Sequence, residues 1–79
     1  MSEIACIELS SVPTPLVSGA ARRVDRESGD RIIAFNGCPI VGREIDAGEI
    51  EFSFPRNKVI RESLIDWMLY WGIPFRVMP

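Results

Sequence analysis

The stretch from residue 49 to residue 77 constrains the fold most, because it reads as a strand, a helix and a second strand. Residues 49–54 alternate strictly between polar and apolar side chains, which is typical of a half-buried strand. Residues 57–71 carry one apolar stripe at helical spacing, wide enough to cover a sheet. Its members are Ile60, Leu64, Trp67, Met68 and Trp71. Residues 73–77 alternate again, which predicts that the chain returns to the sheet.

The preceding part of the chain predicts further strands separated by turns. The strand expected at residues 4–9 is apolar on both faces, which favours a central position in the sheet. Two prolines within residues 10–15 predict a loop. Residues 31–35 and 39–45 are expected to form a hairpin through a type I′ turn at Asn36-Gly37. The last strand is expected beside one of these meander strands.

Together these segments predict an α+β fold of two layers. The sheet is antiparallel, has five to six strands and forms a β-meander. One C-terminal α-helix packs on one face of the sheet, and a final strand follows. Asn57 is the expected N-cap of the helix, and Gly72 is the expected residue just after its end.

Length and composition favour one small domain spanning residues 1–79, with a net charge of −2. No apolar run approaches the roughly 18 residues of a membrane span, and the start lacks the pattern of a signal peptide. Cytoplasmic residence is therefore expected. Cys6 and Cys38 are both expected inside strands, as structural thiols and not as a disulfide.

The absence of histidine limits the chemistry available to this chain. No Ser-His or Cys-His nucleophile pair and no HExxH metal site can be assembled. The two cysteines are too few for a four-cysteine zinc site, and the glycines are too dispersed for a phosphate-binding loop. We therefore expect no enzyme activity, no catalytic residue, no metal site and no cofactor.

Four carboxylates fall within one short hairpin, without a cation among them. They are Glu44, Asp46, Glu49 and Glu51. Alternation on the strand predicts that the last two are exposed to solvent. Such a surface can imitate nucleic-acid phosphates and occupy a basic groove on a partner. A solvated hairpin, partly offset by Arg76, is the simpler interpretation.

A second charged segment is rich in arginine. Its basic residues are Arg22, Arg23, Arg26 and Arg31, and three acids lie between them. Guanidinium groups suit contact with phosphates or with carboxylates of a partner. Cross-strand ion pairs with the interleaved acids would explain the pattern without a partner, and this interpretation is favoured.

The predicted helix carries two further signals. Arg56, Lys58 and Arg61 gather at its start, where the helix dipole disfavours cations, so either function or an unselected surface effect explains them. Ile65 and Leu69 lie well outside the apolar stripe. This surplus apolar surface predicts an interface with a partner or with a second copy, such as a homodimer.

As a whole, the chain resembles the small phage-encoded anti-CRISPR proteins in being short, single-domain, mildly acidic and built from a sheet plus a helix. The resemblance covers size and character and no shared motif. It implies a non-enzymatic inhibitor that binds a CRISPR effector complex, in particular a multisubunit type I complex, so that target DNA cannot bind. For a phage-encoded protein, the site of action would be the cytoplasm of the host cell.

Two alternatives stay open. The arginine hairpin could serve a nucleic-acid-binding or regulatory module, although no aromatic side chain is interleaved with its basic residues. The apolar back of the helix could instead be the seam of a structural subunit in a larger particle.

Overall fold

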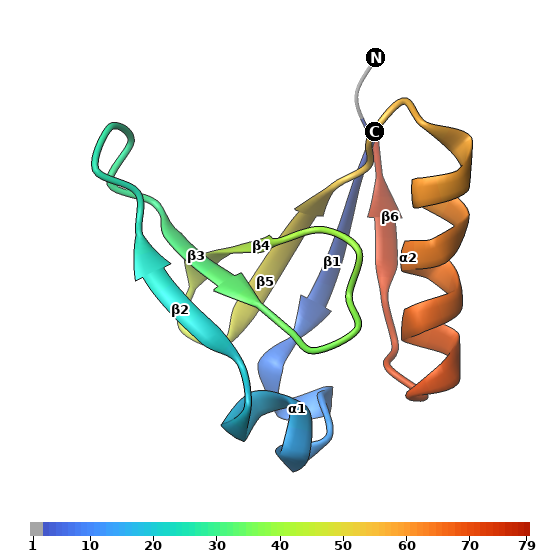
Figure 1. The fold of residues 1–79 in the computed structure, drawn as a ribbon, viewed down its shortest axis with the longest axis horizontal. Coiled ribbons are helices and arrows are strands. Elements are labelled where there is room, and N and C mark those ends of the chain that lie inside the picture. Colours follow the sequence, from blue (N-terminus) through green and yellow to red (C-terminus); the bar gives the residue numbers. More distant parts are fainter. Residues whose placement is uncertain (1–2) are drawn as a thin grey trace.

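The computed structural model describes residues 3–79 and forms one antiparallel sheet with helices at its sides (Figure 1). The helices are η1, a 3₁₀ turn (Leu9–Ser11), α1 (Thr14–Ser18) and α2 (Lys58–Tyr70). The strands are β1 (Ile4–Glu8), β2 (Ala21–Val24), β3 (Arg31–Ala34), β4 (Gly42–Asp46), β5 (Glu49–Ser53) and β6 (Arg76–Met78).

The sheet has six strands in the order β2-β3-β4-β5-β1-β6. Strands β3 to β5 correspond to the predicted meander, β2 extends it at the outer edge, α2 is the predicted C-terminal helix, and β6 is the predicted final strand. The α+β prediction is therefore confirmed. β1 lies between β5 and β6, which confirms its predicted central position. The expectation that the last strand would lie beside a meander strand was wrong, because β1 already occupies the place next to β5.

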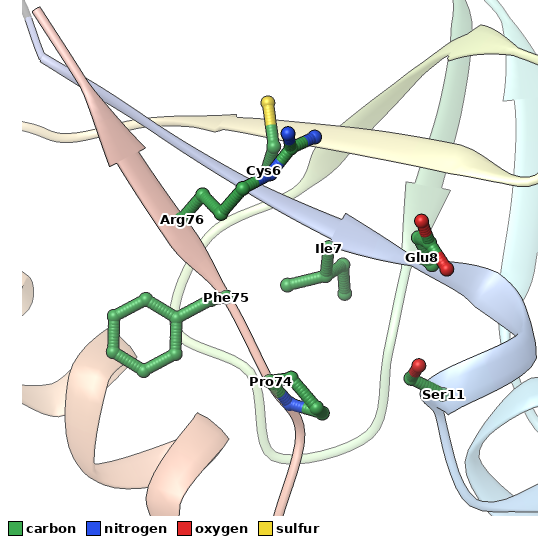
Figure 2. Close-up of a pocket in the computed structure, with 7 residues that line it drawn as sticks. All are labelled: Cys6, Ile7, Glu8, Ser11, Pro74, Phe75 and Arg76. Carbon is green, nitrogen blue, oxygen red and sulfur yellow. The ribbon is translucent and has the colours of Figure 1, made fainter.

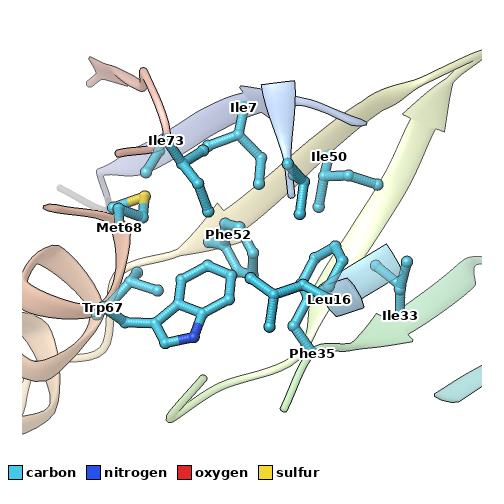
Figure 3. Close-up of a cluster of buried hydrophobic side chains, with 12 residues drawn as sticks. Ile7, Leu16, Ile33, Phe35, Ile50, Phe52, Trp67, Met68 and Ile73 are labelled. Atoms are coloured by element: carbon cyan, nitrogen blue, oxygen red, sulfur yellow. The ribbon is translucent and has the colours of Figure 1, made fainter. Parts of the chain in front are cut away.

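The core lies between the sheet and the two helices (Figure 3). Register places Ala5 opposite Phe52, and Ile7 opposite Ile50, on the face that the helices cover. Leu64, Trp67 and Met68 of α2 and Leu16 of α1 complete the cluster, and all four side chains are buried. The Trp67 ring packs 5.6 Å from the Phe35 ring and 6.4 Å from the Phe52 ring, measured between centroids.

Helix α1 and the 3₁₀ turn occupy part of the region that was predicted as a loop. Pro15 stands in the first turn of α1, where its missing N–H costs no hydrogen bond. Leu16 then reaches the core and is only 3% exposed. The two prolines thus begin a short helix here, which the loop prediction missed.

Residues 35–41 form a longer connection than the predicted two-residue turn. Gly37 has a φ of +77°, but Asn36 does not have the positive φ that a type I′ turn requires. The N–H of Cys38 donates to the carbonyl oxygen of Phe35 at 3.2 Å, closing a tight turn. β4 begins only at Gly42, so the prediction of a return strand from residue 39 was wrong. Cys38 accordingly lies in this connection and not in a strand.

Helix α2 begins and ends near its predicted bounds. The side-chain oxygen of Asn57 accepts hydrogen bonds from the N–H groups of Val59 at 2.9 Å and Ile60 at 3.2 Å, which confirms the N-cap. Gly72 has a φ of +66°, as expected of a residue that follows a helix. Trp71 was predicted on the buried stripe, but it is 38% exposed because the helix ends one residue earlier.

Candidate partner-binding surfaces

The arginine hairpin is the connected pair β2 and β3 together with the turn between them. All four residues of β2 are exposed, and so is Arg31 at the start of β3. Within residues 3–79, none of Arg22, Arg23, Arg26 and Arg31 makes an ion pair. The prediction that cross-strand ion pairs neutralise this hairpin was therefore wrong.

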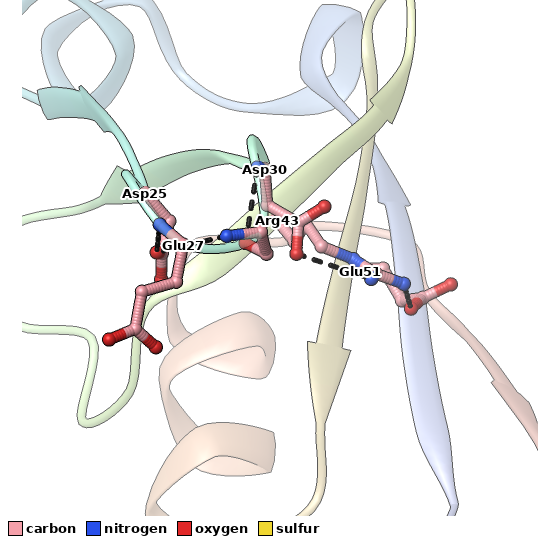
Figure 4. Close-up of polar contacts among 6 residues, drawn as sticks. Asp25, Glu27, Asp30, Arg43 and Glu51 are labelled. Carbon is pink, nitrogen blue, oxygen red and sulfur yellow. Dashed lines mark hydrogen bonds and ion pairs between the residues drawn. The ribbon is translucent and has the colours of Figure 1, made fainter.

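The acids of the same hairpin are engaged elsewhere (Figure 4). The Asp25 carboxylate accepts hydrogen bonds from the backbone N–H groups of Glu27 at 2.8 Å and Ser28 at 3.4 Å, and so shapes the turn. The Asp30 carboxylate pairs with Arg43 on β4 at 3.6 Å. Asp25 thus shapes the hairpin's own turn and Asp30 pairs with β4, so neither carboxylate pairs with a hairpin arginine, and the guanidinium groups face solvent.

Arg43 lies between two carboxylates on the sheet face that α2 does not cover. Its guanidinium donates to Glu51 at 2.6 Å and approaches Asp30 at 3.6 Å. The hydrogen bond to Glu51 and the charges of both carboxylates raise the pKa of Arg43 further above its ordinary value. The cluster therefore links β4 and β5 to Asp30, the residue just before β3, on the open face of the sheet.

The acidic hairpin is less exposed than the alternation predicted. The Glu51 side chain is only 14% exposed, because Arg43 covers it. Glu49 is half-buried and lies 3.5 Å from Arg76, which confirms that Arg76 offsets part of this charge. Asp46 is exposed and Glu44 is half-buried. Glu49 and Glu51 thus make ion pairs, whereas Glu44 and Asp46 make none within residues 3–79.

The basic residues at the start of α2 differ in their surroundings. Arg61 pairs with Glu3 at 3.0 Å, and its guanidinium carbon lies 5.5 Å from the centroid of the Phe54 ring. The ion pair and the contact with the aromatic ring offset the cost of placing a cation near the start of a helix, which the sequence did not reveal. Arg56 and Lys58 are exposed.

The C-terminal end of α2 presents an apolar surface to solvent. Ile65 is half-buried and packs against the core, so it contributes less to this surface than expected. Leu69 is 65% exposed and Tyr70 is 80% exposed. The Tyr70 and Trp71 rings meet edge to face, with 5.3 Å between centroids. We call Leu69, Tyr70 and Trp71 the apolar helix end.

A depression of about 250 Å³ lies where β1 meets the chain that leads into β6 (Figure 2). Ile7, Pro74 and Phe75 give it apolar walls, while Glu8 and Arg76 supply the charged groups. Cys6 also lines this depression, and its burial, with the Glu51 and Glu49 charges, raises the pKa of its thiol. Burial likewise raises the pKa of Cys38, and both cysteines are free. High thiol pKa values make both cysteines poor nucleophiles.

Two structural findings concern metals and membranes. In the part of the chain that the structure describes, no three metal-ligating side chains come together to hold an ion. Among residues 3–79, no helix has the length and apolarity needed to cross a bilayer.

Comparison of this chain with protein-family models, with curated proteins and with solved structures gave no match.

Proposed function

We propose that this chain is a small non-enzymatic protein that acts in the cytoplasm by occupying a surface on a larger protein assembly. The observation that supports this most is the apolar helix end, where Leu69 and Tyr70 are 65% and 80% exposed. Large apolar side chains exposed together mark interaction sites more often than isolated ones do. Tyrosine and tryptophan are also enriched among residues that dominate binding energy.

The arginine hairpin supports the same proposal from another part of the molecule. In Figure 1 it lies at the end of the sheet away from α2. Its guanidinium groups lack ion pairs within residues 3–79, so they are available to carboxylates or phosphates of a partner. One surface can therefore join copies of the chain, while the other contacts the target.

The specific form of the proposal is an anti-CRISPR inhibitor that binds a type I effector complex and prevents binding of target DNA. It rests on the resemblance in size and character stated above. Binding of this kind requires surface complementarity and no catalytic group. The inhibition would therefore need about one inhibitor, or one dimer, per complex.

A plasmid-interference assay tests this form. The chain is expressed in a panel of strains, each with one active type I system, and each strain is transformed with a targeted plasmid. The proposal predicts that transformation recovers in at least one strain. Recovery is lost when Arg22→Gln is combined with Arg23→Gln and Leu69→Arg. Unchanged interference in every strain, with the chain detected as soluble protein, would contradict the anti-CRISPR form.

A nucleic-acid-binding function is the second candidate, favoured by the four hairpin arginines, which make no ion pair within residues 3–79. Binding of this kind would weaken steeply as salt is raised, because counterions are released from the nucleic acid. It would also persist after removal of every other protein, which separates it from the first proposal.

A further inference from the structure

We propose that the free edge of β2 accepts an extended acidic segment of a protein partner as an added antiparallel strand. The inference rests on the proposed function only in that the chain binds a protein. It names the place of contact and the chemistry of the segment. The place is defined by Ala21–Val24, the outermost strand of the sheet.

Backbone geometry provides the first support. β2 pairs with β3 on one side, and its other side is open (Figure 1). The N–H of Asp25 donates to the carbonyl oxygen of Asp30 at 2.8 Å, and such bonds alternate along an antiparallel pair. The backbone groups of Arg23 therefore point toward β3, while those of Arg22 and Val24 point outward. An added strand would pair with these two residues.

Side-chain charge provides the second support. Arg22 lies opposite Ile33 and Arg23 lies opposite Ile32, so one guanidinium stands on each face of the edge. Neither has an ion pair in the described chain, and both are exposed. A depression of about 310 Å³ adjoins them, lined by Arg22, Arg23, Val24, Arg31, Ile32 and Glu44. Three of its six lining residues are arginines and one is an acid, so the depression favours a negatively charged occupant.

A second copy of the chain fits this edge poorly. A two-fold pairing of β2 that sets Arg22 opposite Val24 of the other copy would place Arg23 directly opposite Arg23 of that copy. Like charges opposite one another destabilise a strand pair. Arginines on an edge strand thus discourage self-pairing, as edge charges commonly do.

Nucleic acid also fits less well than a peptide. Sequence-tolerant binding of single strands relies on aromatic rings on which bases stack. Residues 21–34 contain no aromatic side chain. The outward N–H and carbonyl groups of Arg22 and Val24, in contrast, match the backbone of another strand.

The register specifies the acidic segment further. Opposite Val24, the segment should carry an apolar residue, and opposite Arg23 and Arg22 it should carry two consecutive acids. Because successive side chains alternate between faces, the two acids reach the two guanidinium groups separately. The expected motif is therefore apolar–acid–acid–apolar.

The test uses the full chain and a fluorescein-labelled peptide with the sequence Thr-Val-Glu-Glu-Val-Thr. Fluorescence polarisation should detect saturable binding, and replacing both glutamates by glutamine should weaken it about tenfold or more. N-methylation of the second glutamate, which faces Arg22, should abolish binding. N-methylation of the first should leave binding within about twofold, because that N–H points away from β2. Equal effects of the two methyl groups, or equal binding of the glutamine peptide, would overturn the proposal.

Variants of the chain provide the matched arm of the test. Val24→Pro removes an outward N–H and no bond to β3, so it should abolish peptide binding while Val24→Thr preserves it. Arg22→Gln with Arg23→Gln should reduce binding about tenfold or more, and Arg26→Gln in the turn should reduce it less than about twofold. Circular dichroism verifies that each variant is folded. Peptide binding that survives the double arginine substitution would overturn the proposal.

The strand-addition proposal and the proposed function can each be contradicted without contradicting the other. An oligothymidylate of about 12 nucleotides that binds more tightly than the acidic peptide would overturn the strand-addition proposal in favour of nucleic acid. Capture of an effector complex that is insensitive to Val24→Pro would overturn strand addition and leave the proposed function standing. Peptide binding without any effect on CRISPR interference would support strand addition and count against the anti-CRISPR form alone.

Discussion

The indole Nε1–H of Trp67 donates a hydrogen bond to the backbone carbonyl oxygen of Asn36, with 3.1 Å between nitrogen and oxygen. This bond fastens α2 to the connection between β3 and β4. The same indole packs against Phe35, the residue with which the connection begins. One side chain of the helix thus contacts two successive residues of the connection, just after β3 ends.

Replacing Trp67 by phenylalanine should lower the free energy of unfolding by about 1–2 kcal/mol, because the part-buried hydrogen bond to the Asn36 carbonyl is lost while most apolar contact remains. Urea denaturation followed by circular dichroism measures the change. Trp71→Phe is the matched control and should change stability much less, since Trp71 is 38% exposed. Equal losses in the two variants would contradict this role of Trp67.

Replacing Asn57 by alanine should cost about 1 kcal/mol of stability, because two N–H groups at the start of α2 lose their acceptor. Thermal unfolding compares the stability of Asn57→Ala and Asn57→Asp with that of the parent. The aspartate variant retains the acceptor and should unfold close to the parent. A loss of stability in the aspartate variant as large as in the alanine variant would contradict the cap.

Replacing Gly42 by alanine should destabilise the fold by about 1–3 kcal/mol through overpacking. A Cβ atom at this position would stand 2.6 Å from Ile50 Cγ2 and 2.9 Å from Phe52 Cε1, both on the neighbouring core strand. Chemical denaturation measures the loss. An unchanged midpoint would mean that β4 does not approach β5 as closely as described.

The thiol of Cys6 predicts a decline of stability in alkaline solution. Its pKa is raised in the folded protein from an ordinary value of 9.0 by burial and by nearby carboxylates. The folded chain therefore keeps the proton to higher pH than the unfolded chain does. The stabilisation is fully present below about pH 9 and is lost as pH rises toward the folded-state pKa.

The free energy of unfolding of the parent and of Cys6→Ala, measured from pH 7 to pH 10.5, checks this expectation. The alanine variant starts less stable, and its stability should fall less steeply above about pH 9 than that of the parent. Parallel curves for the two proteins would contradict the role of Cys6.

The apolar helix end predicts self-association. Sedimentation velocity should find the parent as a dimer at micromolar concentration, and Leu69→Arg should raise the dissociation constant about tenfold or more with no loss of helix signal. Val59→Arg is the control, because Val59 is 70% exposed near the other end of α2. A monomeric parent, or equal effects of the two arginines, would count against this surface.

Local patterns predicted the elements whose signals lie within the element itself. Alternation along residues 49–54, the Asn57 cap and the apolar spacing of the helix located β5 and α2, since side-chain periodicity directly follows backbone geometry. The apolar run of β1 also indicated its central position. These features need no knowledge of the rest of the chain.

Features that depend on tertiary contacts could not be predicted in the same way. The bond from Trp67 to Asn36 joins residues far apart in sequence and overrides the local preference of Asn36-Gly37 for a type I′ turn. The choice of ion-pair partners also depends on tertiary contacts. Arg43 pairs with both Asp30 and Glu51, so that within residues 3–79 the hairpin arginines make no ion pair, and sequence alone does not specify this choice. The exposed arginine edge is therefore a result of the fold.

Affinity capture most directly tests the claim that this chain works by binding a protein. The tagged parent is compared with Arg22→Gln/Arg23→Gln and with Leu69→Arg in nuclease-treated bacterial lysate. We expect the parent to retain a defined set of proteins, with subunits of a type I CRISPR complex among them for the anti-CRISPR form, and the arginine variant to lose them. Retention of nucleic acid alone, and only when nuclease is omitted, would contradict a protein-binding function.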